Sequence, residues 1–195
     1  MQKARAAWPN LIAPYQLDDL HFLDETWSST NMIRTHGYAP LGERLIGKVP
    51  QAHWKTISFV GALTTRGIVA PWALDQGMTG DWFLAYVRQI LVPVLRPGNV
   101  VIMDNLSSHK VSGVQEAIES VGAKVLLLPK YSPDLNPIEK AFSKLKGLLR
   151  SAAARTVPKL YGALRKIVGK ITPEESVGYL RHCGYSAAIP TSRAV

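Results

Sequence analysis

The second half of the chain alternates short apolar runs with amphipathic segments, and this order constrains the fold more than any other feature. Residues 100–103 and 125–128 are apolar throughout, which predicts two buried strands. Residues 112–121 and the segment that starts at Asn136 carry apolar residues at helical spacing. A strand without a polar face needs cover on both sides. We therefore expect an α/β fold, a mixed sheet with helices on both faces.

The first half of the chain predicts further strands. Residues 20–25 predict a short strand that ends in acidic residues, and residues 57–63 and 68–74 predict two strands joined by a tight turn. Residues 28–55 are rich in glycine, proline and basic residues, and we interpret them as a hairpin or flap with weak strands. The remaining helices are expected at residues 81–95, 157–170 and 174–183.

Length and composition favour one domain. The chain has 195 residues, 47% of them apolar, which is enough for a sizeable core, and no change of composition resembles a linker. We expect an N-terminal lead-in at residues 1–19, which can hold a short helix. The domain itself is expected at residues 20–185, followed by a loose tail at 186–195.

The charge balance favours a polyanionic partner. The chain has 23 Lys and Arg against 14 Asp and Glu, a formal net charge of +9, and nucleic acid is the commonest polyanion. The single cysteine, Cys183, excludes a disulfide framework and a thiolate metal site, and we interpret it as a small core residue. No apolar run is long enough to cross a bilayer. We therefore expect a cytoplasmic protein.

Three acidic residues stand where a metal site could form. Asp24 and Asp104 each follow an apolar strand, and sites in open α/β sheets gather at strand ends. Glu139, near a helix start, could complete a carboxylate cluster. Such carboxylates repel one another, and a divalent cation such as Mg²⁺ relieves that repulsion. A pair of ions could hold both the attacking and the leaving oxygen of a phosphoryl transfer.

Each acid also has a simpler interpretation. Either aspartate could be an acid at a strand-to-loop junction. Asn136 and Pro137 make a good helix start, in which Glu139 would be a capping glutamate only. On a helical wheel, however, Glu139 lies outside the apolar face, beside Ser143, Lys146 and Arg150. That polar side would suit a DNA backbone, although a solvated helix face would look the same.

Two motifs carry a family resemblance. They are Asp104-Asn105-Leu106-Ser107-Ser108-His109 and the longer Leu-Pro-Lys-Tyr-Ser-Pro-Asp-Leu-Asn-Pro-Ile-Glu of residues 128–139. Both resemble bacterial insertion-sequence transposases of the mariner superfamily, and the 34 residues between Asp104 and Glu139 match the spacing typical of that branch. Phe22-Leu23-Asp24-Glu25-Thr26 is similar to the strand that bears the first aspartate of the family. The resemblance extends from about Leu20 to about Cys183.

The resemblance implies a fold and an activity. The catalytic domains of the family carry an Asp-Asp-Glu triad on a ribonuclease-H-like fold, as retroviral integrases do. Their reaction cuts DNA at the element's ends and joins the freed 3′ hydroxyl to target DNA, usually at a TA dinucleotide. Asp24 and Asp104 would bridge two Mg²⁺ or Mn²⁺ ions, and Glu139 would complete the second metal site.

The resemblance also implies partners. Transposases of this type generally act as homodimers that hold two DNA ends. Full-length relatives carry N-terminal helix-turn-helix modules, whereas only 23 residues precede Asp24 here. We expect such a module on a separately encoded polypeptide, or the chain to be a fragment. Binding of DNA by the chain alone is then expected to be weak, salt-sensitive and largely nonspecific. The location would be the bacterial cytoplasm, at the nucleoid.

Further residues have supporting or DNA-binding interpretations. Asn105 could orient Asp104 or cap a turn, and His109 could contact phosphate, support the metal site, cap a helix or belong to the core. Glu25 should point away from Asp24, to the opposite face of its strand. Asp134 is interpreted as a turn residue. The DNA-binding candidates are Lys130, Tyr131, Ser143, Lys146, Arg150, Arg44 and Lys48, the last two in a segment that mixes cations with aromatics.

Two alternatives remain beside an active transposase. One is a related nuclease of the same fold that cleaves DNA without strand transfer. The other is a catalytically silent DNA-binding or assembly remnant of a transposase.

Overall fold

The computed structural model describes residues 2–51, 53–106, 109 and 111–186. Its centre is a five-stranded mixed sheet in the order β3-β2-β1-β4-β5, as the alternation of strands and helices predicted. The central strand β1 pairs antiparallel with β2 and parallel with β4. The strands are β1 (Leu20–Ser29), β2 (Thr56–Thr64), β3 (Gly67–Leu74), β4 (Val100–Met103) and β5 (Lys124–Leu127).

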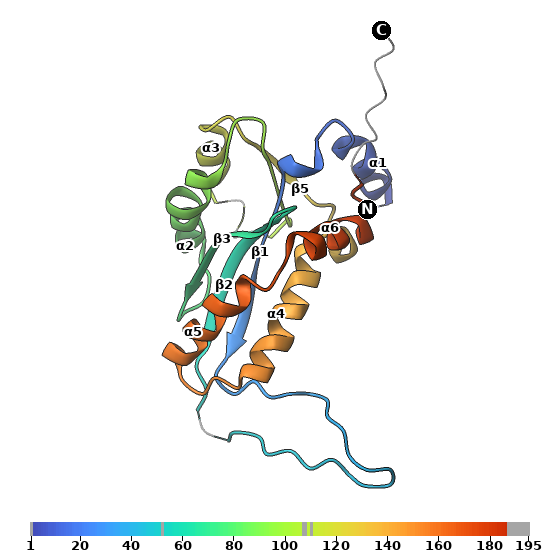
Figure 1. Ribbon diagram of the computed structural model, residues 1–195. Helices are drawn as coiled ribbons and strands as arrows, with labels where there is room; N and C mark the ends of the chain where they lie inside the picture. Colours follow the sequence, from blue (N-terminus) through green and yellow to red (C-terminus); the bar gives the residue numbers. More distant parts are fainter. Residues whose placement is uncertain (1, 52, 107–108, 110, 187–195) are drawn as a thin grey trace.

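Helices cover both faces of the sheet (Figure 1). One face carries α2 (Gly80–Tyr86), which continues as a π-helical turn to Leu91, and α3 (Val114–Glu119). The opposite face carries the other four helices, which are α1 (Gln2–Ile12), α4 (Ile138–Ala152), α5 (Val157–Val168) and α6 (Pro173–His182). The expected helices are therefore present, although α3 is shorter than the predicted 112–121.

Side chains of β1 and β4 alternate between two separate cores. Phe22 and Ile102 belong to the core beneath α4 and α5, whereas Leu23 and Met103 belong to the core beneath α2 and α3. All four are at most 1% exposed, because a central strand is covered on both faces. This alternation fixes the direction of the residues that follow each strand.

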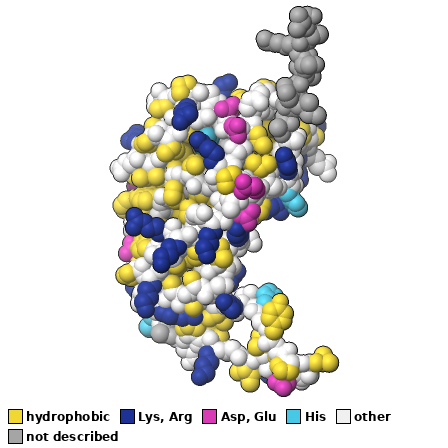
Figure 2. All heavy atoms as spheres, viewed as in Figure 1, with side chains coloured by type: hydrophobic (Ala, Val, Ile, Leu, Met, Phe, Trp, Pro, Cys, Tyr) yellow, Lys and Arg dark blue, Asp and Glu magenta, His cyan; other side chains and the backbone are white. Residues whose placement is uncertain are grey.

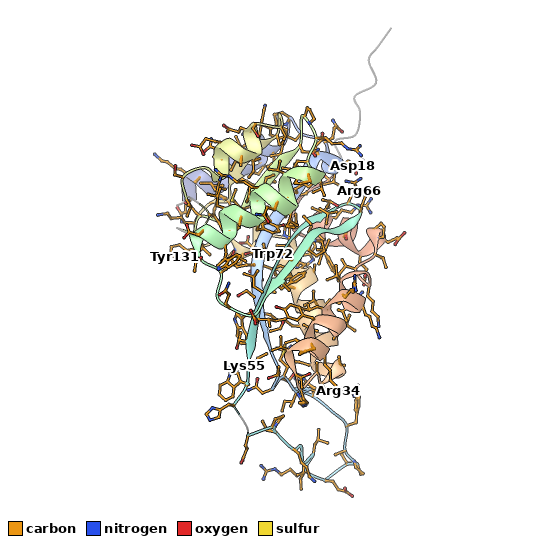
Figure 3. The ribbon with its side chains drawn as sticks, turned by 90° about the vertical axis from the view of Figure 1, so that its left-hand side faces the viewer. Asp18, Arg34, Lys55, Arg66, Trp72 and Tyr131 are labelled. Atoms are coloured by element: carbon orange, nitrogen blue, oxygen red, sulfur yellow. The ribbon has the colours of Figure 1, made fainter. Side chains whose placement is uncertain are left out.

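Two predicted segments differ from the structure. No described residue between Thr30 and Lys55 belongs to a strand, so the prediction of weak strands in a flap was wrong. This stretch leaves the body as a long loop in Figure 1, without a neighbouring strand to pair with, and Figure 3 shows Arg34 and Lys55 near its base. The strand predicted as fully buried at 125–128 is β5, an edge strand whose Lys124 and Leu127 are exposed.

The N-terminal segment packs onto the domain. Residues 1–19, expected as a lead-in, contain α1, and its Trp8 is 4% exposed within the core that also holds Phe22. Cys183 lies buried in the same core, which confirms its interpretation as a small packed residue. Of the expected tail, residues 187–195 lie outside the described residues. Among the helices that the structure describes, none has both the length and the apolarity to cross a membrane.

Gly67→Ala and Gly162→Ala should have opposite effects on stability. Gly67 has φ +111°, and an added Cβ would lie 2.9 Å from the carbonyl oxygen of Ile171. We expect Gly67→Ala to lower the free energy of unfolding by about 2 kcal/mol or more. Gly162, inside α5, has open space around it, so alanine there should add about 0.5–1 kcal/mol. Urea unfolding of both variants measures the two free energies, and equal effects would contradict the requirement for glycine at position 67.

Candidate active site

Strand register brings Asp24 and Asp104 together. The parallel ladder between β1 and β4 ends at the pair Leu23 and Met103, so the two aspartates occupy the next, equivalent positions on strands about 4.8 Å apart. Asp24 follows the alternation of Phe22, which directs it to the face that α4 covers. Asp104, which comes directly after β4, lines the same cavity as Asp24. The sequence predicted that the two aspartates lie close together because both follow apolar strands, and the parallel register of β1 and β4 explains why they do.

One detail of that prediction was wrong. Asp24 does not end its strand, because β1 continues to Ser29 and pairs with β2 along its length, with Asp24 opposite Gly61. On its other side β1 pairs with β4, and this pairing ends just before Asp24 because β4 stops at Met103. The site forms where one side of a long central strand loses its partner.

Glu139 approaches from α4. Ile138, the first residue of that helix, is fully buried in the core that contains Phe22, which fixes the start of α4 above the sheet. Asp24, Asp104 and Glu139 line one cavity of about 400 Å³, together with the loop of residues 128–136. The three residues predicted as a triad are therefore neighbours in space.

Burial and like charges act together on Asp24. Its side chain is buried, and its pKa is raised from 3.8 to about 7, first by desolvation and then by the charges of Glu139, Asp104 and Glu25. The backbone N–H of Glu25 donates to Oδ1 at 2.8 Å, which acts in the opposite direction. The Nδ2 of Asn136 donates to Oδ2, also at 2.8 Å.

The three carboxylates are of a chemical type that binds divalent cations, but they lie too far apart to hold one ion together. Three carboxylates on one cavity are oxygen ligands of the kind that Mg²⁺ takes. The pKa of Asp24 is raised first by desolvation and then by the nearby carboxylates, and a bound cation would offset both effects. Among the described residues, no three histidine, cysteine or carboxylate side chains already lie close enough to hold a metal ion. The acids line the cavity without being gathered around one point.

His109 lies between two carboxylates. Its Nδ1 is 2.7 Å from Oδ1 of Asp104, and its Nε2 is 2.7 Å from Oε2 of Glu25. Burial lowers the pKa of His109, but the contacts with Asp104 and Glu25 outweigh this and raise it to about 10. The ring packs on Phe83, with 4.4 Å between the centroids. Because His109 is 2% exposed, this geometry favours support of Asp104 over contact with phosphate.

Glu25 confirms the predicted alternation along β1. It points to the face opposite Asp24, where His109 and Phe83 lie. Asn105 lines the cavity, and its buried Oδ1 has no hydrogen-bond partner in the described part of the chain. The donor to Oδ1 of Asp104 in this turn is the backbone N–H of Leu106, at 3.0 Å.

The helix-capping interpretation of Glu139 was wrong. In the described residues α4 begins without a side-chain cap, and the residue before its first turn is Pro137. Asn136, expected as the cap, instead donates its Nδ2 to Asp24. Without Asn136, Oδ2 of the buried Asp24 would lack this donor, and a buried carboxylate oxygen needs one more than a helix start does.

The DNA-binding candidates fall into three groups. Lys130 and Tyr131 line the cavity, and Tyr131 is 85% exposed with φ +56°, a strained conformation for a tyrosine. Figure 3 shows Tyr131 at the outer edge of the body. Ser143, Lys146 and Arg150 follow Glu139 along α4, and Lys146 lies 5.2 Å from the ring centroid of Trp27. Arg44 and Lys48 are exposed in the loop at 30–55 and do not line the cavity.

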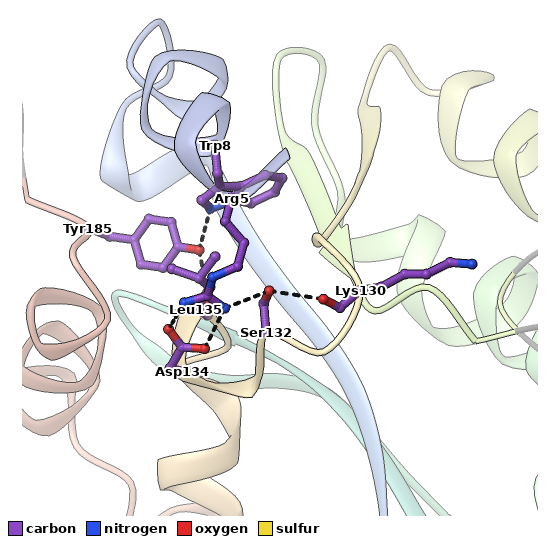
Figure 4. Close-up of polar contacts among 7 residues, drawn as sticks. All are labelled: Arg5, Trp8, Lys130, Ser132, Asp134, Leu135 and Tyr185. Carbon is purple, nitrogen blue, oxygen red and sulfur yellow. Dashed lines mark hydrogen bonds and ion pairs between the residues drawn. The ribbon is translucent and has the colours of Figure 1, made fainter. Parts of the chain in front are cut away.

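Sequence reasoning missed the residues that hold the cavity loop from outside. Asp134 lies in a turn, as expected, but it also pairs with Arg5 of α1 through two contacts of 2.9 and 2.6 Å. Arg5 also donates to the hydroxyl of Ser132 at 2.8 Å (Figure 4). These partners are more than 120 residues apart in sequence, and no local pattern links them.

Comparison with known families gives one match that covers most of the chain. The family model described as DDE superfamily endonuclease matches residues 19–161. No match was found among curated proteins.

Several solved structures of Mos1 transposase have a similar fold. A pre-cleavage Mos1 transpososome aligns with a TM-score of 0.71 and 17% identity over 94% of this chain and 58% of that one. The Mos1 paired-end complex with left transposon end gives 0.70 and 16% over 93% and 56%. The Mos1 catalytic domain with raltegravir and Mg gives 0.62 and 14% over 94% and 85%. The chain spans somewhat more than half the length of the first two proteins.

Asp24→Asn should stabilise the protein at neutral pH when divalent ions are removed. Because the pKa of Asp24 is raised to about 7, folding favours the protonated acid, and stability is lost as the pH rises through that value. Asparagine does not ionise, so its advantage over the wild type should grow by about 2–4 kcal/mol between about pH 4 and pH 8. Thermal melts in chelator measure this. A difference that does not change with pH would contradict the raised pKa.

Proposed function

This chain belongs to the DDE superfamily of endonucleases, and we propose on that basis that it is the catalytic domain of a DNA transposase of the mariner superfamily. Such an enzyme cleaves DNA at the ends of a mobile element and joins the freed ends to target DNA. The observation that carries the proposal is the position of Asp24, Asp104 and Glu139 around one cavity. The likeness of fold to Mos1 transposase, which was solved as a pre-cleavage transpososome and as a strand transfer complex, supports it.

Asp24, Asp104 and Glu139 would hold Mg²⁺ or Mn²⁺, with two ions in the active site. When bound, such ions supply an activated water and stabilise the charge on the leaving oxygen. Mos1 complexes have been solved with Mn and with Mg. The residues of this chain then act by position, because phosphoryl transfer needs alignment and charge stabilisation above all.

The surroundings of the acids fit a DNA backbone. Lys130 and Tyr131 border the cavity, and Ser143, Lys146 and Arg150 continue from Glu139 along α4. Figure 2 shows Lys and Arg side chains gathered over the lower half of the viewed face. The helix α5 carries Lys159, Arg165 and Lys166. Together with the net charge of +9, these cations favour salt-sensitive binding of DNA.

The partners follow from this activity. They are the DNA ends of the element, a target that contains a TA dinucleotide, and a second copy of the chain in the active complex. A helix-turn-helix polypeptide would supply recognition of the ends. We place the protein in the bacterial cytoplasm, at the nucleoid.

Loss of any one acid should abolish metal-dependent cleavage. We expect Asp24→Asn, Asp104→Asn and Glu139→Gln each to lower the rate of DNA cleavage in Mn²⁺ by at least about two orders of magnitude, because each removes a metal ligand. The assay follows nicking of supercoiled plasmid and joining of pre-cut element ends. Glu119→Gln, which changes an exposed acid on α3, is the control and should keep the activity. Cleavage without joined products would favour a nuclease over a transposase, and cleavage by all three variants would refute the site.

Tyr131 should contribute to DNA binding and little to stability. Asparagine tolerates the left-handed conformation of this residue, so Tyr131→Asn should change the free energy of unfolding by less than about 0.5 kcal/mol. Loss of a ring that stacks on a base should weaken DNA binding by about 1–3 kcal/mol. Fluorescence anisotropy with single-stranded and duplex DNA measures this, and Tyr131→Phe, which keeps the ring, should bind like the wild type. Wild-type affinity in Tyr131→Asn would exclude the stacking role.

A further inference from the structure

The loop of residues 128–136 forms one wall of the cavity, and hydrogen bonds hold it on two sides. It connects β5 with α4, and it carries Lys130 and Tyr131 on the cavity side. Its last residue, Asn136, is 4% exposed although it is polar and lies in a loop. A buried polar side chain in such a place needs a specific partner.

The inner fastening is the hydrogen bond from Asn136 to Asp24. Nδ2 donates to Oδ2 of the carboxylate at 2.8 Å, and both groups are buried. The bond spans 112 residues of sequence and joins the central strand to the start of the helix that carries Glu139. The Oδ1 of Asn136 is buried without a partner in the described part of the chain, so it remains free to accept a bond from water in the cavity.

The outer contact is made at Leu135, the residue before Asn136. The hydroxyl of Tyr185 donates to the carbonyl oxygen of Leu135 at 2.6 Å and accepts a bond from Nε1 of Trp8 at 2.9 Å (Figure 4). Tyr185 is 4% exposed, and its ring lies against Phe22, two residues before Asp24, with 4.7 Å between the centroids. Tyr185 therefore contacts both the loop and the strand that the inner bond connects.

We infer that Asn136 is a positioning residue that fixes the carboxylate of Asp24, and that Tyr185, oriented by Trp8, holds Asn136 in place. This inference rests on the proposed function, because it concerns the readiness of Asp24 to take a divalent cation. A hydrogen bond to one oxygen limits rotation of the carboxylate while other lone pairs stay available to a cation. Partners of this kind change metal affinity by about 10–100-fold when they are removed. Trp8 and Tyr185 lie outside residues 19–161, the part that the family model matches.

The test measures Mn²⁺ binding by calorimetry on the full chain without DNA. Asn136→Leu keeps the approximate volume and removes the amide, and we expect it to weaken Mn²⁺ binding by about tenfold or more. Tyr185→Phe keeps the packed ring and removes only the hydroxyl, and a weakening of about threefold is expected because it acts through Asn136. Tyr161→Phe, on α5 in another part of the fold, is the matched control and should bind like the wild type.

A second measurement separates positioning from damage to the fold. Cleavage by Asn136→Leu should recover as Mn²⁺ is raised, whereas a misfolded protein would not recover, and circular dichroism reports the fold directly. If Asn136→Leu does not fold, Tyr185→Phe decides. Mn²⁺ affinities equal to the wild type in the folded variants, while Asp24→Asn loses binding, would overturn this inference alone. Equal binding by Asp24→Asn and the wild type would overturn the proposed metal site, and the inference with it.

Discussion

The parallel register between β1 and β4 is the constraint on which the site depends. It pairs Leu23 with Met103, and Asp24 and Asp104 are the next residues along the two chains, so the spacing of the sheet brings their backbones close together. The cost is electrostatic, because two carboxylates and the nearby Glu139 share one cavity. Desolvation by burial raises the pKa of Asp24 most, and the charges of Glu139 and Asp104 raise it further.

The neighbouring residues reduce this cost without removing it. Asn136 and the backbone of Glu25 donate to Asp24, and His109 lies between Asp104 and Glu25 on the other side of β1. Asp24 is thus held by donors from its own strand and from the residue before Pro137 at the start of α4.

The contacts that hold the loop of residues 128–136 come from both ends of the described chain. Trp8 and Arg5 of α1 and Tyr185, which follows α6, contact the same few residues before α4. Figure 1 shows α1 and the C-terminal end of the described chain on the same side of the molecule as the start of α4. Elements with no part in the chemistry thereby fix the wall of the cavity, since a loop without such contacts would not hold a side chain to a single orientation.

The sequence by itself predicted most of the helices and strands and pointed to the three acids that line the cavity. Uninterrupted apolar runs predict covered strands, helical spacing predicts α4, and the motif from Leu128 to Glu139 carries the family resemblance. These signals are local, because side-chain periodicity and motif spacing lie within a short stretch of chain. Only the tertiary structure decided that Asn136 donates to Asp24 and does not cap the helix. It also decided that His109 lies between Asp104 and Glu25, and that β5 lies at the sheet edge. Those outcomes depend on which distant groups are desolvated together, and desolvation is a property of the packed molecule.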